Sequence, residues 1–372
     1  MFRYWKEDTP EARDFSTLLV GLLSESTQGA ADPNELLRIA AGIRAGNRDD
    51  WTLSFLNMGT FILSLAEAAV SAGDRQSAAE AYLRAFTCFR AAELMRRPDD
   101  PQKVELYRRA IDCFRRGLAA SHHRHEAVSF PYDGYRLEGY FFPARGATGR
   151  APCVVFLSGA DALPEQNFFR GAQWLTSRGL SCFVFNGPGQ GGTLRLLKVP
   201  TLAEYERPVG AAIDYLAARR DVDPERIGLL GVSMAGYYGM RAAAFEPRIK
   251  AVVAWGAMYS VYEDLWRHYP PLRRQLVWIT GSKDEAEAEK KLPGFTLEGI
   301  LHRVRIPVLI THGVNDEMVP VSSAERTCRE LASADKTLRI YTPEDGGDTH
   351  INIDNWSQVV PVMADWLRRK LQ

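Results

Sequence analysis

The sequence predicts an α/β protein with a mostly parallel central sheet, preceded by an all-helical N-terminal domain. Residues 1–124 show helical periodicity and no convincing strand, whereas from Glu126 onward the hydrophobic pattern changes to period two. Beyond residue 150, short apolar runs typical of buried strands alternate with helical segments, as they do in parallel sheets. In the middle of this region a strand, a sharp turn centred on Ser233 and a helix follow one another.

Two segments of the N-terminal region resemble each other and predict a pair of packed helices. Residues 82–90 and 107–115 each carry apolar side chains at positions i, i+3, i+4 and i+7, which form a stripe along one helix face. A turn rich in Pro and Asp, residues 96–101, separates them. Because such stripes must bury against a partner, we expect residues 1–124 to form a cap over an active site. A dimerisation domain or a purely structural domain is the alternative.

The second domain is expected to span residues 125–372. It opens with a hairpin pattern over residues 126–142, whose turn is marked by Pro, Asp and Gly at 131–134. Buried strands are predicted at residues 151–157 and 181–185. Residues 256–299 interrupt the alternation of strands and helices, and their content of Trp, Tyr, Pro and charged residues suits a lid-like insertion.

The turn at residues 231–236 has the pattern of a nucleophile elbow, the feature that places a reactive serine in the α/β-hydrolase fold. Residues 226–230 are strand-like and residues 237–245 are helical, so Ser233 sits on the sharp turn between them. The turn is strained, and Gly231 and Ala235 are small enough to permit it. The helix directs its positive end, including the N–H of Met234, toward charge that develops beside Ser233.

An acid and a histidine follow in the chain order of this fold. Asp316 comes just after the apolar strand predicted at residues 306–313, and His350 lies in a Gly- and Asp-rich loop after the strand at 338–341. The order Ser, Asp, His is that of α/β-hydrolases. We therefore predict a catalytic triad of Ser233, Asp316 and His350.

The loop after the first buried strand of the second domain is expected to complete an oxyanion hole. Gly159 lets the backbone approach closely, so the N–H of Ala160 would be the second donor beside that of Met234. Candidate substrate-binding residues lie in this loop and in the insertion: Gly159, Asp161, Tyr259, Glu263 and Asp264.

The glycine run at residues 186–192 does not indicate a nucleotide site. It lacks the Lys-Ser/Thr of a P-loop and the G-x-G-x-x-G spacing of a dinucleotide fold. We interpret it as a tight loop near the rim of the active site, and no cofactor is expected.

Composition excludes several classes of partner. Acidic and basic residues balance at 46 each, so no net field favours nucleic acid or an anionic membrane. The 5 cysteines and the histidines at 122, 123 and 125 lack metal-ligand spacing, so no metal is expected. Cys153 and Cys182 lie in predicted core strands and are expected to be buried free thiols. The N-terminus has no apolar signal core, and no segment approaches the roughly 18 apolar residues that span a bilayer. We expect a cytoplasmic protein acting on a small molecule, as a monomer or a homodimer.

The chain resembles a group of α/β-hydrolases that contains 2,6-dihydroxypseudooxynicotine hydrolase and the fungal polyketide-shortening hydrolases of pigment pathways. The resemblance rests on the all-helical N-terminal domain, the Gly-x-Asp-type loop at residues 157–161, the Tyr-Tyr-x-x-Arg-Ala-Ala that follows the elbow, and residues 241–256. Ala235 and Asn186 depart from the commoner Gly and Asp. The resemblance implies cleavage of a C–C bond of the β-diketone type in an aromatic or polyketide-like compound.

The predicted reaction proceeds through an acyl-enzyme. His350 takes the proton of Ser233, Asp316 orients His350, and the oxyanion hole holds the tetrahedral intermediate. The same machinery would cleave an ester, an amide or a short peptide, which is the alternative substrate class. A third reading is a non-catalytic helical-repeat interaction protein that carries an inactive hydrolase domain.

Overall fold

The computed structural model describes residues 3–372. Two compact units make up the chain, one ending at Arg124 and the other beginning at His125.

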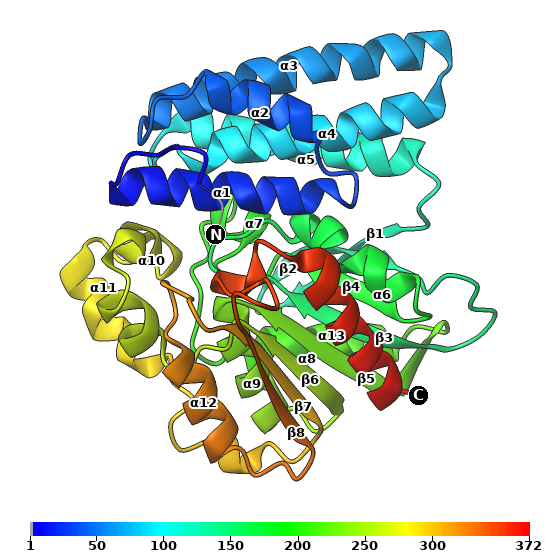
Figure 1. Cartoon of the computed structure of the whole chain (residues 1–372). Helices are drawn as coiled ribbons and strands as arrows, with labels where there is room; N and C mark the ends of the chain where they lie inside the picture. The colour runs from blue at the N-terminus through cyan, green and yellow to red at the C-terminus, as the bar shows by residue number, and fades with distance from the viewer. Residues whose placement is uncertain (1–2) are drawn as a thin grey trace. The chain divides into compact units, whose positions relative to one another are not determined.

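The first unit is a helical bundle (Figure 1). Side chains at the N-caps of four helices accept hydrogen bonds from backbone N–H groups, which satisfies donors that have no partner inside the helix. The helices are α1 (Pro10–Ser26), α2 (Pro33–Ala41), α3 (Arg48–Ala72), α4 (Arg75–Leu94) and α5 (Pro101–Ala120).

The two predicted stripes pack in the way the sequence indicates. α4 carries the first stripe and α5 the second, and the two helices lie against each other. Phe86 and Phe114 meet at the centre of the contact with their ring centroids 5.1 Å apart. On the other side of α4, the indole N–H of Trp51 donates to the carbonyl of Ala91 at 2.9 Å. The prediction of a packed helix pair is therefore confirmed.

The length of α3 corrects one expectation from the sequence. This helix has 25 residues and contains an 18-residue window with a mean hydropathy of 1.5, so by length and composition it could cross a membrane. One face of α3 is buried in the bundle through Trp51, Phe55 and Ile62, whereas Leu53 and Phe61 are exposed. Only 22% of that window is buried in the described structure, and a single helix of this kind is a weak indication of a membrane span.

The second unit is built on a sheet of eight strands in the order β1-β2-β4-β3-β5-β6-β7-β8. β2 runs antiparallel to both of its neighbours, and the pairs from β4 to β8 are parallel. The strands are β1 (Glu126–Tyr132), β2 (Tyr135–Phe142), β3 (Ala151–Leu157), β4 (Ser181–Phe185), β5 (Val222–Val232), β6 (Ile249–Trp255), β7 (Val308–Gly313) and β8 (Lys336–Tyr341). Because these five neighbouring pairs are parallel, the loops that follow the strands share one edge of the sheet.

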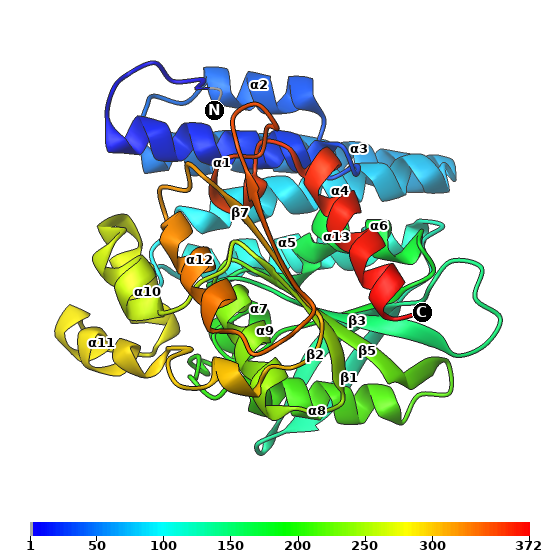
Figure 2. The same ribbon diagram turned by 60° about the horizontal axis from the view of Figure 1, so that its bottom comes forward.

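Helices cover both faces of this sheet, with α8 and α9 on one face and α6 and α13 on the other (Figure 2). The predicted α/β-hydrolase fold is confirmed by this architecture and by the comparisons described below. The helices of the unit are α6 (Gln173–Thr176), α7 (Gly191–Arg195), α8 (Glu206–Ala217), α9 (Met234–Phe245), α10 (Arg273–Ile279), α11 (Glu285–Lys291), α12 (Val321–Glu330) and α13 (Trp356–Lys370).

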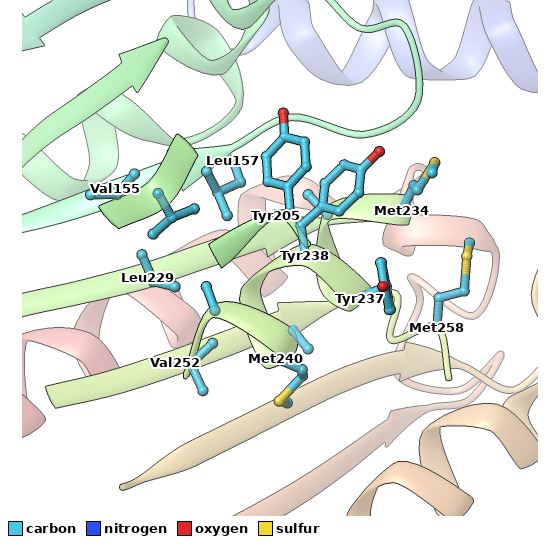
Figure 3. Packing of buried hydrophobic residues seen from close by; sticks show 14 of the residues in the cluster. Val155, Leu157, Tyr205, Leu229, Met234, Tyr237, Tyr238, Met240, Val252 and Met258 are labelled. Carbon is cyan, nitrogen blue, oxygen red and sulfur yellow. The ribbon is translucent and has the colours of Figure 1, made fainter. Parts of the chain in front are cut away.

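The core of the second unit fixes α9 against the middle of the sheet. Met240 and Tyr238 of α9 pack with Leu229 of β5, Leu157 of β3 and Val252 of β6 (Figure 3). All five are almost completely buried, and burial of each such side chain stabilises the fold by about 1.5–3 kcal/mol. This packing holds the N-terminus of α9 at the carboxyl end of β5.

The residues between β6 and β7 depart from simple strand–helix alternation. A π-helical turn (Tyr262–Arg267) precedes α10 and α11, and short 3₁₀ turns connect these elements to β7. Ser260 and Thr296 form an isolated antiparallel bridge near the two ends of the segment 256–299.

Candidate active site

Ser233 occupies the sharp turn between β5 and α9. Its backbone has φ 58 and ψ −125, in a region that side-chain-bearing residues rarely adopt. The Ser233 N–H donates to the carbonyl of Trp255 at 2.8 Å, which ties the turn to the end of β6. A Cβ on Gly231 would lie 2.0 Å from the carbonyl oxygen of Ala235, so only glycine fits there. A strained backbone held in this way is typical of functional sites.

The structure brings Ser233, His350 and Asp316 together although they follow three different strands. Ser233 Oγ lies 2.9 Å from His350 Nε2, and His350 Nδ1 lies 2.8 Å from Asp316 Oδ2. The second carboxylate oxygen, Asp316 Oδ1, accepts from the N–H groups of Met318 and Val319, both at 2.9 Å. Both ring nitrogens of His350 are thus positioned, one toward a hydroxyl and the other toward a carboxylate.

The electrostatics around Asp316 keep its carboxyl group ionised. Burial opposes the charge, but the neighbouring His350 and the hydrogen bonds outweigh it, so the pKa of Asp316 lies below its ordinary value. A carboxylate at this position can hold the Nδ1–H of His350 and stabilise the imidazolium form. Glu317, the adjacent acid, is exposed.

The loop that carries His350 is fastened by side chains around it. Asn352 Oδ1 accepts from the indole N–H of Trp255 at 3.0 Å, which ties the loop to β6. The indole N–H of Trp356 donates to the carbonyl of Ile351 at 2.9 Å, and Thr349 Oγ1 donates to Asp354 at 2.8 Å. These bonds hold the imidazole in place from both sides of the histidine.

His312 is a further residue at this site that the sequence analysis did not single out. It stands near the end of β7, four residues before Asp316, and its side chain is completely buried. Its Nε2 lies 2.9 Å from the carbonyl of Val319 and 3.3 Å from Asp316 Oδ2. Burial lowers the pKa of His312 despite the nearby carboxylate, which favours the neutral ring. Because the Val319 carbonyl can only accept, its contact with Nε2 places the proton on that nitrogen. No sequence pattern marks His312, because its contact with Asp316 exists only in the folded structure.

Two backbone N–H groups lie where an oxyanion hole is expected. Met234 is the first residue of α9, so its N–H has no acceptor in a preceding turn of the helix. Gly159 packs against the nucleophile: a Cβ built on it would lie 3.2 Å from Ser233 Cβ. Within residues 3–372, the N–H of the next residue, Ala160, donates to no protein acceptor. The role of both N–H groups as oxyanion donors stays a prediction.

The candidate substrate-binding residues outside the Gly159 turn have identifiable partners in the structure. Asp264 Oδ2 accepts from Ser323 Oγ and from the N–H groups of Tyr259 and Ser260, so it organises the start of the insertion. Glu263 is exposed and pairs with Arg267 one turn later. Contact of these side chains with a substrate remains a prediction.

Asp161 and Tyr259 are also engaged by protein groups. Asp161 is buried, accepts from Gln275 of α10 and lies 3.6 Å from the guanidinium of Arg195. The Tyr259 hydroxyl donates to Glu330 of α12 at 2.7 Å. Substrate binding by these two residues likewise remains untested.

Comparison with known sequences places the site in a family. The profile of the prolyl oligopeptidase family matches residues 166–372, which is more than half of the chain and includes all three residues of the predicted triad. The chain belongs to the prolyl oligopeptidase family.

Individual relatives are similar to this chain over most of its length. A hydrolase of Pyricularia oryzae is 33% identical, with 80% of this chain and 81% of the relative covered. The 20-hydroxy-prefusarin hydrolase of Gibberella moniliformis is 31% identical and covers 91% of both chains. The 2,6-dihydropseudooxynicotine hydrolase of Paenarthrobacter nicotinovorans is 30% identical over 81% of this chain and 79% of the relative. These relatives confirm the group to which the sequence was compared.

A solved structure agrees with the fold. The crystal structure of 2,6-dihydroxy-pseudo-oxynicotine hydrolase superposes with a TM-score of 0.82 at 24% identity and covers 94% of this chain and 95% of its own. The family membership and these relatives identify the protein as an α/β-hydrolase enzyme. Among residues 3–372, no group of three His, Cys, Asp or Glu side chains is arranged to hold a metal ion.

Proposed function

We propose that this prolyl oligopeptidase family member is a serine hydrolase that cleaves a C–C bond beside a carbonyl group, through an acyl-enzyme on Ser233. The observation that carries the proposal is the continuous contact from Ser233 Oγ through the imidazole of His350 to the buried carboxylate of Asp316. This arrangement matches the roles of nucleophile, general base and orienting acid.

The first half of the reaction forms the acyl-enzyme. Ser233 Oγ attacks the substrate carbonyl carbon while its proton passes to His350 Nε2, and the carbonyl oxygen becomes an oxyanion facing the N–H groups of Met234 and Ala160. The tetrahedral intermediate collapses by breaking the C–C bond. The bonding electrons leave as an enolate, and the proton on His350 is transferred to the enolate carbon.

The second half releases the acid. A water molecule attacks the ester carbonyl while His350 takes its proton, and the resulting intermediate expels Ser233 Oγ, which recovers a proton from His350. The net reaction consumes one water and converts a β-diketone into a carboxylic acid and a ketone.

The substrate class rests on the relatives. Two of them are named for polyketide-type or aromatic small molecules, 20-hydroxy-prefusarin and 2,6-dihydropseudooxynicotine. The similarity to each extends over at least four-fifths of this chain, so it reaches into the helical unit. An aromatic or polyketide-like ketone is therefore the substrate that we propose.

Ester, amide or peptide hydrolysis is the second candidate, and the family match favours considering it because the family is named for a peptidase. The triad chemistry is common to all these substrates, since only the leaving group differs. The choice depends on how the pocket holds the leaving fragment and protonates it.

A matched substrate panel separates the two candidates. Phenolic β-diketones, p-nitrophenyl esters and a prolyl peptide amide are offered to the wild type and to Ser233→Ala, and the products are identified by mass spectrometry. We expect cleavage of at least one β-diketone to an acid and a ketone, with a kcat/KM above that for the esters. Turnover of the esters or peptide alone would discard C–C cleavage and leave the second candidate.

A further inference from the structure

The glycine-rich segment 186–195, which follows β4, holds the loop that carries Ala160. We call residues 158–162 the oxyanion loop and residues 186–195 the clamp segment. The side-chain amide of Gln190, which is only 2% exposed, donates to the carbonyl of Gly159 at 3.1 Å and also to the carbonyl of Ser158. Because both partners are carbonyl oxygens, the atom that faces them must be the donor nitrogen of the amide.

This bond fixes the direction of the Ala160 N–H. The carbonyl of Gly159 and the N–H of Ala160 belong to one planar trans peptide group, in which they point in opposite directions. When Gln190 holds the carbonyl on its own side, the N–H is directed to the other side. Gly159 itself lies against Ser233, with the position of a Cβ 3.7 Å from Ser233 Oγ. Rotation of this peptide would turn a carbonyl toward the developing oxyanion instead of a donor.

Further contacts between the two segments hold the next residues of the oxyanion loop in the same way. Arg195 donates to the carbonyl of Asp161 at 2.9 Å, and its guanidinium lies 3.6 Å from the Asp161 carboxylate. The Gly191 N–H donates to the carbonyl of Ala162 at 3.1 Å. Asp161 has φ 47, a left-handed conformation that is unfavourable for a non-glycine residue. Its carbonyl and its carboxylate are both held by Arg195, which stabilises this conformation.

The clamp segment is itself rigidly built. Asn186 Oδ1 accepts from the Gly192 N–H at 2.8 Å, and Asn186 Nδ2 donates to the carbonyl of Glu138 on β2 at 3.2 Å. A Cβ on Gly191 would lie 1.6 Å from Asn186 Oδ1, so the turn can close only with glycine. The amide of Asn186 supplies both a donor and an acceptor here, whereas the commoner Asp would have no donor when ionised. The glycine run thus has a structural purpose that involves no phosphate.

We propose that the clamp segment preorganises the oxyanion hole and that Gln190 is a positioning residue, which holds the Gly159–Ala160 peptide so that its N–H faces the oxyanion. The proposal rests on the proposed serine hydrolase function. The side-chain amide of Gln190 donates to the carbonyls of Ser158 and Gly159, so its proposed effect on the reaction passes through the peptide that it holds.

The test compares three variants on an activated p-nitrophenyl ester. Gln190→Leu removes the donor at similar volume, and Gln190→Glu retains the shape but replaces the donor by an oxygen that repels the two carbonyls. Gln358→Leu, at an exposed glutamine on α13, is the matched control. Loss of one oxyanion donor costs on the order of 10²–10³ in kcat, so we expect kcat to fall by about 10–100-fold in both Gln190 variants. KM should change little in the two Gln190 variants. The kcat and KM of the control Gln358→Leu should match those of the wild type.

A second readout separates positioning from a general structural role. A trifluoromethyl ketone that adds reversibly to Ser233 forms an oxyanion, whereas the corresponding carbinol binds without forming one. Affinity for the ketone should weaken by the same factor as kcat/KM, and affinity for the carbinol should stay constant. Equal weakening of both inhibitors would show that Gln190 merely supports the pocket, and unchanged ketone affinity in a folded variant would also overturn the proposal.

Fluorophosphonate labelling of the wild type distinguishes failure of this inference from failure of the proposed function. If the wild type labels at Ser233 and turns over the ester while Gln190→Leu behaves like the control, only the proposed role of the clamp segment is wrong. If the wild type neither labels nor turns over any substrate of the panel, the proposed function fails and the clamp fails with it. If Gln190→Leu does not fold, the same kinetic and inhibitor measurements are made on Gln190→Glu and compared with the wild type and Gln358→Leu.

Discussion

His312 Nε2 lies 3.3 Å from Asp316 Oδ2, the same oxygen that His350 Nδ1 approaches at 2.8 Å. Two imidazoles therefore share one carboxylate oxygen. His312 also donates to the carbonyl of Val319, which requires a proton on Nε2 and leaves a buried lone pair on Nδ1. A neutral His312 can hold the Asp316 carboxylate in position without placing a second positive charge beside it. His350 is then the group whose imidazolium form Asp316 stabilises.

The depressed pKa of His312 predicts acid sensitivity of the fold. Because burial disfavours the imidazolium form, the unfolded chain binds a proton more readily than the folded one. Stability should therefore fall as the pH drops below the unfolded value of about 6.5, by up to about 1.4 kcal/mol per pH unit, until the folded pKa is reached. His312→Gln retains a donor at the position of Nε2 but does not titrate, so its unfolding free energy should lack this slope.

Urea unfolding between pH 7.5 and 5 measures this difference, and His302→Gln at an exposed position controls for the loss of one histidine. An identical slope in the wild type and in His312→Gln would contradict the assignment of a buried neutral imidazole.

Asp316 and Glu317 are adjacent acids with opposite expected importance. Asp316→Asn removes the charge that orients His350, so we expect kcat to fall by about 10⁴-fold with little change in substrate binding. Glu317→Gln alters an exposed side chain and should retain wild-type turnover. Steady-state kinetics on one ester substrate gives both values. If the activities of the two variants were reversed, the wrong carboxylate would have been assigned.

Local sequence patterns were sufficient to predict the residues that approach one another at the triad. The elbow around Ser233 is a contiguous motif, and the strand before Asp316 and the loop around His350 can be ordered by chain position alone. Gln190 and His312 could not be assigned in this way, because their importance lies in contacts with Gly159 and Asp316 that only the folded sheet creates. A buried glutamine in a glycine-rich turn has no distinctive spacing.

The insertion shows a second limit of sequence reasoning. Composition indicated an interruption of the regular alternation, and the structure has a π-helical turn and short helices there. Composition could not indicate that Asp264 accepts three hydrogen bonds from protein groups. An acid in a lid-like segment has the same sequence signal whether it holds the backbone or a substrate.

The buried ion pair between Glu93 and Lys103 predicts a large effect on the stability of the helical unit. Lys103 Nζ lies 2.9 Å from Glu93 Oε1, and both side chains are almost inaccessible. Lys103→Met removes the buried cation that faces the Glu93 carboxylate, so it should destabilise the unit by about 3–5 kcal/mol. The double variant Lys103→Met/Glu93→Leu should recover much of this loss.

Calorimetry of the two single variants and the double variant tests the pair. Equal melting temperatures for Lys103→Met and the wild type would contradict a stabilising role of the pair.

The role of the helical unit as a cap stays a prediction from the sequence. An aromatic substrate needs an apolar pocket shielded from water, and the edge of a parallel sheet does not enclose one by itself. A protein that begins at Glu126 should therefore lose kcat/KM on its β-diketone substrate by a larger factor than on p-nitrophenyl acetate. Both rates are measured on the same preparation, with circular dichroism to verify folding.

Full activity of the truncated protein on both substrates would contradict the cap. Sedimentation of the two proteins would then show whether residues 1–124 serve as a dimer interface instead.

Site-resolved labelling tests whether Ser233 is the nucleophile. The wild type is treated with a fluorophosphonate, digested and analysed by mass spectrometry, beside Ser233→Ala with an unchanged melting temperature. We expect one phosphonyl adduct in the wild type, on the peptide that contains Ser233, and its formation should parallel the loss of turnover. Ser233→Ala should show neither adduct nor turnover. An adduct on another residue, or substantial turnover by Ser233→Ala, would contradict the assignment of Ser233 as the nucleophile.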